Sequence, residues 1–130
     1  MPPYLHTVGV VVRDMPKALA FYRILGLDIP ADEDLSQHVE YTSTIGYAIG
    51  FVAEATVRET DPKWQDGKGH RLNLQFSFDS PSEVDATYAK LISAGYEGYK
   101  EPWDAFWGQR FARIIDADGN VVNLFAQLVE

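Results

Sequence analysis

Four aromatic side chains stand in segments that we expect to be loops, where flat rings can stack on a planar small molecule. Trp103, Phe106 and Trp107 cluster in one stretch, and Trp64 lies in a polar segment earlier in the chain. Pockets for drug-sized molecules are mostly apolar with a few placed polar groups, so this cluster favours ligand binding. The alternative is that these rings close the ends of the core or a contact between subunits.

Residue types that carry covalent or metal chemistry are few. The chain of 130 residues has no cysteine, which excludes thiol catalysis and thiolate ligation of a metal, and it has three histidines. The segments expected to line a cleft show no acid–base pair and no nucleophile held by a base. We therefore predict no catalytic residues and no cofactor, and binding is favoured over catalysis without excluding an enzyme.

Composition and charge set the class of protein. Hydrophobic residues make up 46% of the chain and charged residues 23%, as in globular proteins, and the length suits one domain. A net charge of −8 argues against a nucleic-acid partner, whose phosphates need a basic surface. It is compatible with a cationic ligand, although surplus carboxylates that only keep a small domain in solution are the simpler explanation.

The chain shows no export signal and no apolar run of membrane-spanning length. We therefore predict a cytoplasmic location and no membrane partner.

The first half of the chain predicts a strand, a helix and two further strands. Asp14 can cap the helix and Gly26 can end it, with Met15, Leu19 and Tyr22 on its buried face. The expected elements are a strand at 5–12, a helix to about residue 25, and strands at 38–44 and 45–53.

The second half repeats this order. Leu72, Leu74, Phe76 and Phe78 alternate with polar residues and predict a strand with one core face. The sequence Ser80-Pro-Ser-Glu83 is a capping box that opens a helix, which Gly95 closes. Residues 97–106 predict an irregular aromatic loop, and residues 107–126 predict a hairpin around the turn Asp116-Ala-Asp-Gly-Asn120.

A shift of 66 residues superposes the two halves. It lays Val12 on Phe78, Asp14 on Ser80 and Tyr22 on Tyr88, so that strand end, helix cap and helix face coincide. We predict a single domain over residues 1–130, built from a module at about 4–54, a linker at about 55–71 and a module at about 72–130.

Several of these segments together resemble a known family. Val12-Arg-Asp14, Ala20-Phe-Tyr-Arg-Ile-Leu-Gly-Leu27, Trp107-Gly108 and the turn at 116–120 resemble the vicinal oxygen chelate superfamily of glyoxalase I, bleomycin-resistance proteins and extradiol dioxygenases. The resemblance covers nearly the whole chain. It implies an α+β fold of two βαβββ modules, each a curved four-stranded sheet with its helix on the outer face, which together form a cleft. It also implies a homodimer.

The resemblance assigns the positions at which enzymes of the superfamily usually carry metal ligands. In this sequence they are Thr7, Gly50, Asn73 and Asn123. None of these residues offers an imidazole, carboxylate or thiolate, so we predict that the metal site is absent.

The three histidines do not replace these ligands if strand parity holds. His6 and His70 have the wrong parity for a ligand position, and His38 belongs to a different strand. A shifted register would make one of them a ligand, and this alternative stays open.

The same parity predicts the lining of the cleft, where small residues make room and amides, rings and one guanidinium contact a ligand. Residues 109, 111 and 113 are expected to face inward because Ala112 and Ile114 suit the layer that faces the helix. The predicted ligand-binding residues are Thr7, Gly50, Asn73, Gln75, Trp103, Phe106, Trp107, Phe111, Arg113 and Asn123.

The favoured function is a metal-independent protein of the bleomycin-resistance kind that binds and sequesters an antibiotic or another planar, cationic natural product. One alternative is an enzyme of the same superfamily, of lyase, isomerase or dioxygenase type, acting on a small carbonyl or aromatic compound. Another is an accessory domain whose cleft has lost its function.

Overall fold

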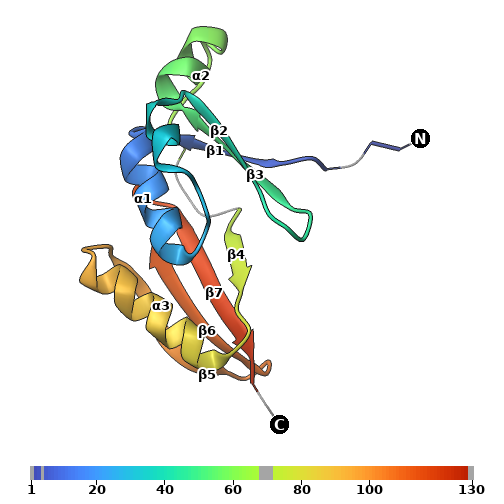
Figure 1. Ribbon diagram of the computed structural model, residues 1–130, viewed down its shortest axis with the longest axis vertical. Coiled ribbons are helices and arrows are strands. Elements are labelled where there is room, and N and C mark those ends of the chain that lie inside the picture. The colour runs from blue at the N-terminus through green and yellow to red at the C-terminus, as the bar shows by residue number, and fades with distance from the viewer. Residues whose placement is uncertain (1, 4, 68–71, 129–130) are drawn as a thin grey trace. The chain divides into compact units, whose positions relative to one another are not determined.

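The computed structural model describes residues 2–3, 5–67 and 72–128, and the chain divides into two compact units at residues 67 and 68. Each unit combines a β-sheet with a helix that follows the first strand of that sheet (Figure 1). The predicted α+β class is therefore confirmed. Among the described residues, no helix combines the length and the apolar character needed to cross a membrane.

The first unit has a three-stranded sheet. Its elements are β1 (Val8–Val12), α1 (Met15–Leu25), the 3₁₀ helix η1 (Ala31–Leu35), β2 (His38–Thr42), β3 (Ala48–Ala53) and α2 (Glu54–Thr60). The strand order is β1-β3-β2, with β1 parallel and β2 antiparallel to β3.

The second unit has a four-stranded sheet. Its elements are β4 (Leu74–Ser77), α3 (Pro81–Ser93), β5 (Gly98–Ala105), β6 (Gln109–Ile115) and β7 (Val121–Gln127). The strand order is β4-β7-β6-β5, with β4 parallel to β7 and the other pairs antiparallel. In both units, therefore, the first and last strands of the sheet form a parallel pair, and a helix follows the first of them along the chain, as the repeat predicts.

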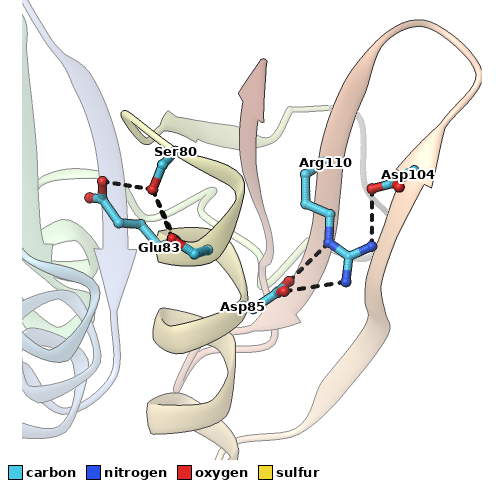
Figure 2. Close-up of polar contacts among 6 residues, drawn as sticks. Ser80, Glu83, Asp85, Asp104 and Arg110 are labelled. Atoms are coloured by element: carbon cyan, nitrogen blue, oxygen red, sulfur yellow. Dashed lines mark hydrogen bonds and ion pairs between the residues drawn. The ribbon is translucent and has the colours of Figure 1, made fainter. Parts of the chain in front are cut away.

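The helix starts follow the predicted caps. The Asp14 carboxylate accepts a hydrogen bond of 3.1 Å from the backbone N–H of Lys17. The Ser80 hydroxyl accepts from the backbone N–H of Glu83 at 3.4 Å and lies 3.1 Å from the Glu83 carboxylate (Figure 2). Gly26 ends α1 with a φ angle of 126°, which a residue with a side chain rarely adopts.

The core of each unit lies between the helix and its sheet. In the first unit Met15, Leu19, Tyr22 and Leu25 are buried as predicted, and the Tyr22 ring lies 5.0 Å from that of Phe51 on β3. In the second unit the fully buried residues of helix and sheet are Val84, Leu91, Ala112, Ile114, Val122, Leu124 and Ala126. Leu72 differs from its predicted core position: it is 86% exposed because β4 begins only at Leu74.

Among the described residues, the first sheet has three strands rather than the four that the resemblance implies. In place of a fourth strand, residues 31–35 form η1, and Arg23 of α1 holds the chain that leads into this turn. The Arg23 guanidinium donates to the carbonyl oxygens of Ile29 and Pro30 at 2.8 and 2.7 Å and pairs with the Asp34 carboxylate at 2.8 Å. The carbonyl oxygens of Ile29 and Pro30 thus accept from a side chain rather than from a neighbouring strand.

The expected loop at 97–106 is instead the edge strand β5. Its pairing with β6 shifts register twice, between Gly98 and Lys100 and between Lys100 and Trp103. Pro102 lies in the second irregularity, and an edge strand tolerates proline because one side needs no hydrogen bonds. These register shifts interrupt the alternation of side chains along the strand, so the residue pattern did not predict β5.

The expected linker contains the helix α2. Arg58 and Glu54 lie one helical turn apart with their charged groups at 3.7 Å, and Pro62 stands just beyond the end of the helix. His70 and the rest of residues 68–71 lie outside the described residues.

We predict that Gly98→Ala destabilises the second unit. A Cβ atom at Gly98 would lie 2.2 Å from the Tyr88 hydroxyl oxygen and 3.2 Å from the Ile92 Cδ1 atom. Because the end of a tyrosine side chain can move, we expect a loss of roughly 1–2 kcal/mol in the free energy of unfolding, measured by urea denaturation.

Adding Tyr88→Phe should restore part of this loss, since it removes the atom in closest contact. Gly9→Ala is the matched control, because a Cβ at that strand glycine meets no atom within 4 Å. Equal stability of Gly98→Ala and the original chain would contradict the packing described for α3.

Candidate functional site

The sheet of the second unit has one face toward α3 and one face away from it. Arg110 of β6 reaches Asp85 of α3, with 2.9 Å between Nε and Oδ1 (Figure 2), so Arg110 lies on the helix side. Side chains alternate along a strand, and Phe111 and Arg113 therefore lie on the opposite face. This is the inward face that the sequence analysis assigned to β6.

Four rings gather on this opposite face. Trp103 lies 5.5 Å from Phe111 and 5.9 Å from Trp107, and Trp107 lies 5.3 Å from Phe111, measured between ring centroids. Phe125 of β7 stacks on Phe111 at 6.0 Å with 18° between the ring planes. We call Trp103, Trp107, Phe111 and Phe125 the aromatic face. Trp107 is 45% exposed, so part of this surface is open to a ligand.

A row of polar side chains runs beside the rings. The pairing of the strands places Asn123 of β7 between Gln75 of β4 and Arg113 of β6. The Asn123 amide nitrogen donates to the Gln75 side-chain oxygen at 3.3 Å. Asn123 is only 6% exposed, yet its Oδ1 atom finds no hydrogen-bond partner among the described residues. A buried acceptor without a donor is uncommon in folded proteins, and a ligand donor would satisfy it.

Two cations lie against the rings. The Lys100 ammonium is 4.7 Å from the centroid of Trp103, and the Arg113 guanidinium carbon is 5.6 Å from Trp103 and 5.3 Å from Phe111. Within the part of the chain that the structure describes, neither Lys100 nor Arg113 forms an ion pair. Lys100 is not among the predicted site residues, because residues 97–106 were expected to form a loop.

Arg110 shows the opposite arrangement on the helix side of the same strand. Besides Asp85, it donates to the Asp104 carboxylate at 3.1 Å (Figure 2). The hydrogen bonds that Arg110 donates to these two carboxylates, that to Asp85 first, raise the pKa of Arg110 above its usual value. Its charge is thus compensated within the protein.

Two other predicted site residues of this unit lie at the margin. The Asn73 amide nitrogen donates to the Val121 carbonyl oxygen at 3.2 Å, which ties the approach to β4 to the start of β7. Phe106 lies 5.1 Å from Trp107 but is 96% exposed. Both border the site without forming its centre.

Thr7 and Gly50, the predicted site residues of the first unit, lie close to each other. A Cβ atom at Gly50 would lie 3.9 Å from the Thr7 hydroxyl and 3.8 Å from His38 Nε2. Phe51 packs on α1, so Gly50 belongs to the sheet face away from that helix. Trp64, also in this unit, lies under Arg58, with 4.8 Å from the guanidinium carbon to the ring.

His6 differs from its predicted orientation. Its Nε2 atom lies 3.3 Å from the Glu40 carboxylate, and Glu40 pairs with Gly50 across β2 and β3. Because β1 begins only at Val8, strand alternation does not govern His6, and its side chain reaches the face of Gly50.

The first unit also contains a hollow of about 310 Å³ beside η1 and β2. Its charged lining residues are Asp28, Glu33 and Glu40, and its one ring is that of Tyr41. It is acidic, whereas the aromatic face carries two cations.

Comparisons with known proteins agree with this architecture. Residues 4–124 match the model of the Glyoxalase/Bleomycin resistance protein/Dioxygenase superfamily. The chain belongs to this superfamily. No curated protein matches the chain.

Solved structures show the same fold. A glyoxalase/bleomycin resistance protein/dioxygenase family enzyme from Burkholderia phytofirmans superposes with a TM-score of 0.80 at 22% identity, covering 94% of this chain and 97% of that one. A glyoxalase-related enzyme from Fulvimarina pelagi gives 0.79 at 14% identity, covering 95% and 88%. A protein of unknown function from Agrobacterium tumefaciens gives 0.73 at 27% identity, covering 98% and 97%.

The residues at the positions where the resemblance places the superfamily's metal ligands do not fit a transition metal. Gly50 has no side chain, and Thr7 offers a neutral hydroxyl. The Asn73 amide group already donates a hydrogen bond to a backbone carbonyl. Divalent zinc, nickel or iron prefers imidazole, carboxylate or thiolate, which all four positions lack. Among the described residues, no three His, Cys, Asp or Glu side chains gather closely enough to hold an ion.

We predict that the purified protein retains no stoichiometric transition metal after incubation with zinc, nickel or manganese and desalting. Elemental analysis of the protein, beside a zinc enzyme treated in the same way, measures this. Roughly one ion per chain, the occupancy of a single site, would contradict it. Loss of that ion in His6→Ala or His38→Ala would then locate the ligands on the first sheet.

Proposed function

We propose that this superfamily member is a metal-independent binding protein that holds and sequesters a planar small molecule in the cytoplasm. The aromatic face of the second unit is the proposed binding surface. The observation that carries the proposal is the Asn123 side chain, which is buried on the sheet face that carries the rings while no described residue donates to its Oδ1 atom. A ligand that stacks on the rings and donates to this atom would satisfy it.

The geometry of the rings supports a planar guest. Trp103 meets Phe111 and Trp107 edge to face, with interplanar angles of 63° and 90°. Edge-to-face contacts fix the orientation of each ring and leave part of a ring face free. A flat ligand can use the half-exposed Trp107, while Phe111 and Phe125 form a supporting layer.

The chemistry of the site favours binding over catalysis. Its polar groups are the amides of Gln75 and Asn123 and the cations of Lys100 and Arg113, with no acid–base pair among them. The superfamily name includes bleomycin resistance proteins, so an antibiotic or a similar natural product is the ligand class that we propose.

We predict saturable binding of at least one compound from a panel of polycyclic aromatic and glycopeptide-type natural products, measured by isothermal titration calorimetry. Trp107→Ala should weaken this binding by about 1–3 kcal/mol, the usual effect of removing an aromatic anchor. Trp64→Ala is the matched control, because that ring lies in the first unit and should leave the dissociation constant unchanged.

A panel without saturable binding, or equal affinity of Trp107→Ala and the original chain, would contradict sequestration on the aromatic face. Circular dichroism of both variants checks that the fold is retained.

A second function, catalysis on a small carbonyl or aromatic compound, is favoured by the contact between His6 and Glu40. An imidazole 3.3 Å from a carboxylate can transfer protons, and Thr7 and His38 lie near Gly50, the strand partner of Glu40. Turnover of such a compound that Glu40→Gln abolishes would favour this function over sequestration.

We also propose that the protein is a homodimer. Each sheet has two edge strands that pair on one side only among the described strands, β1 and β2 in the first unit and β4 and β5 in the second. A second chain can cover such edges, and the 96% exposed Phe106 offers further apolar surface. We predict the mass of two chains by light scattering at micromolar concentration. A monomeric mass with an intact circular dichroism spectrum would contradict this.

A further inference from the structure

We infer that the ligand of the aromatic face is an aromatic anion that also carries a hydrogen-bond donor. The inference rests on the proposed function and specifies its ligand class. It replaces the cationic ligand with which the net charge is compatible. The charged side chains close to the rings, rather than the net charge of the whole chain, decide the sign of the ligand's charge.

The two arginines of β6 differ in their partners. The chain has 19 acidic and 11 basic residues, so carboxylates are abundant. Arg110 takes two of them, whereas no carboxylate pairs with Arg113 among the described residues. Arg113 is half-buried against Trp103 and Phe111, which lowers its exposure to water and strengthens its attraction for an anion.

The sheet of the second unit contains few carboxylates. Strands β4 to β7 contain only Glu101 and Asp104. Asp104 pairs with Arg110, on the helix side. Glu101 forms no ion pair with Lys100 or Arg113 among the described residues. Neither carboxylate therefore compensates the cations of the aromatic face.

The rings already have cationic neighbours, which disfavour a cationic ligand. A cation binds an aromatic ring through the negative face of its π system. Lys100 and Arg113 already lie against Trp103, and Arg113 also lies against Phe111. A cationic ligand would compete with these side chains for the same rings and would be repelled by them.

The net charge of −8 does not reverse this preference. Exposed charges act over about 8 Å at physiological ionic strength, so distant carboxylates are screened. Lys100 and Arg113 contact the rings directly and are not screened in this way.

The Asn123 side chain favours a ligand that carries a hydrogen-bond donor. Asn123 lies directly across from Arg113, and its Oδ1 atom accepts no hydrogen bond from the described residues. A hydroxyl or N–H beside the anionic group of the ligand would donate to this atom. The expected class is therefore an aromatic carboxylate with an adjacent hydroxyl or N–H group.

Three ligands of one shape and different charge test the sign. They are 2-naphthoate, 2-naphthamide and 2-naphthamidine, which are anionic, neutral and cationic. Calorimetry should show that naphthoate binds about tenfold or more tightly than naphthamide, as expected for hydrogen bonds to a charged group. The tryptophan indole N–H signals in NMR spectra report whether each compound contacts the aromatic face. 4-Hydroxy-2-naphthoate should bind more tightly than naphthoate, because its hydroxyl adds the donor and is too far from the carboxylate to bond to it internally.

Two variants locate the charge. Arg113→Gln and Lys100→Gln should each lower the preference for naphthoate over naphthamide about tenfold, since each removes a charge-assisted hydrogen bond. Arg110→Gln is the matched control on the same strand. It should leave the preference unchanged, because Arg110 faces α3 and is already paired.

The outcomes separate this inference from the proposed function. If naphthamidine or naphthamide binds at the tryptophans as tightly as naphthoate, the anionic ligand is wrong while binding on the aromatic face stands. A preference for naphthoate that survives both Arg113→Gln and Lys100→Gln also overturns it. If neither the naphthalene compounds nor the natural-product panel binds, the proposed function fails and this inference fails with it.

Discussion

The packing of one helix onto one face of each sheet fixes everything that the opposite face presents. In the second unit Ala112, Ile114, Val122 and Leu124 are fully buried in the core that α3 and the sheet share. Because strand side chains alternate, a shift of one residue would expose this apolar set and bury the polar one. The alternate residues of β6 and β7 are thereby held on the open face, where Asn123 stands in line with Gln75 and Arg113. The site is a consequence of the core.

The same alternation sorts the charges of β6. Arg110 points to the helix and finds two carboxylates there, while Arg113 points to the rings and finds none among the described residues. Holding an uncompensated cation near other cations reduces stability, and Lys100 adds to this at the same ring. The rings offset part of that repulsion through cation–π attraction. An anionic ligand would remove the rest, so the ligand and the fold would stabilise each other.

The elements that the sequence predicts well are those with regular spacing and standard caps. Asp14 and Gly26 bound α1, Ser80 begins α3, and the turn after Asp116 joins β6 to β7, as expected. The elements that it misses depend on contacts between distant residues. Arg23 holds the carbonyls that lead into η1, and two register shifts conceal β5. Lys100 lies between those shifts, so no count along the chain could place it on the aromatic face. The sheet face of Asn123 and Arg113 could be predicted because β6 and β7 are regular.

The residue at position 123 links the missing metal donors to the charge of the site. The superfamily resemblance places a metal ligand there, and a carboxylate is one of the residue types that such a position favours. A carboxylate at 123 would stand across from Arg113 and would form an ion pair with it in the absence of a metal. Among the described residues, the neutral amide leaves the guanidinium without a carboxylate partner and leaves its own Oδ1 atom without a donor. The predicted absence of the metal donor and the proposed anion-binding surface can therefore result from the same residue.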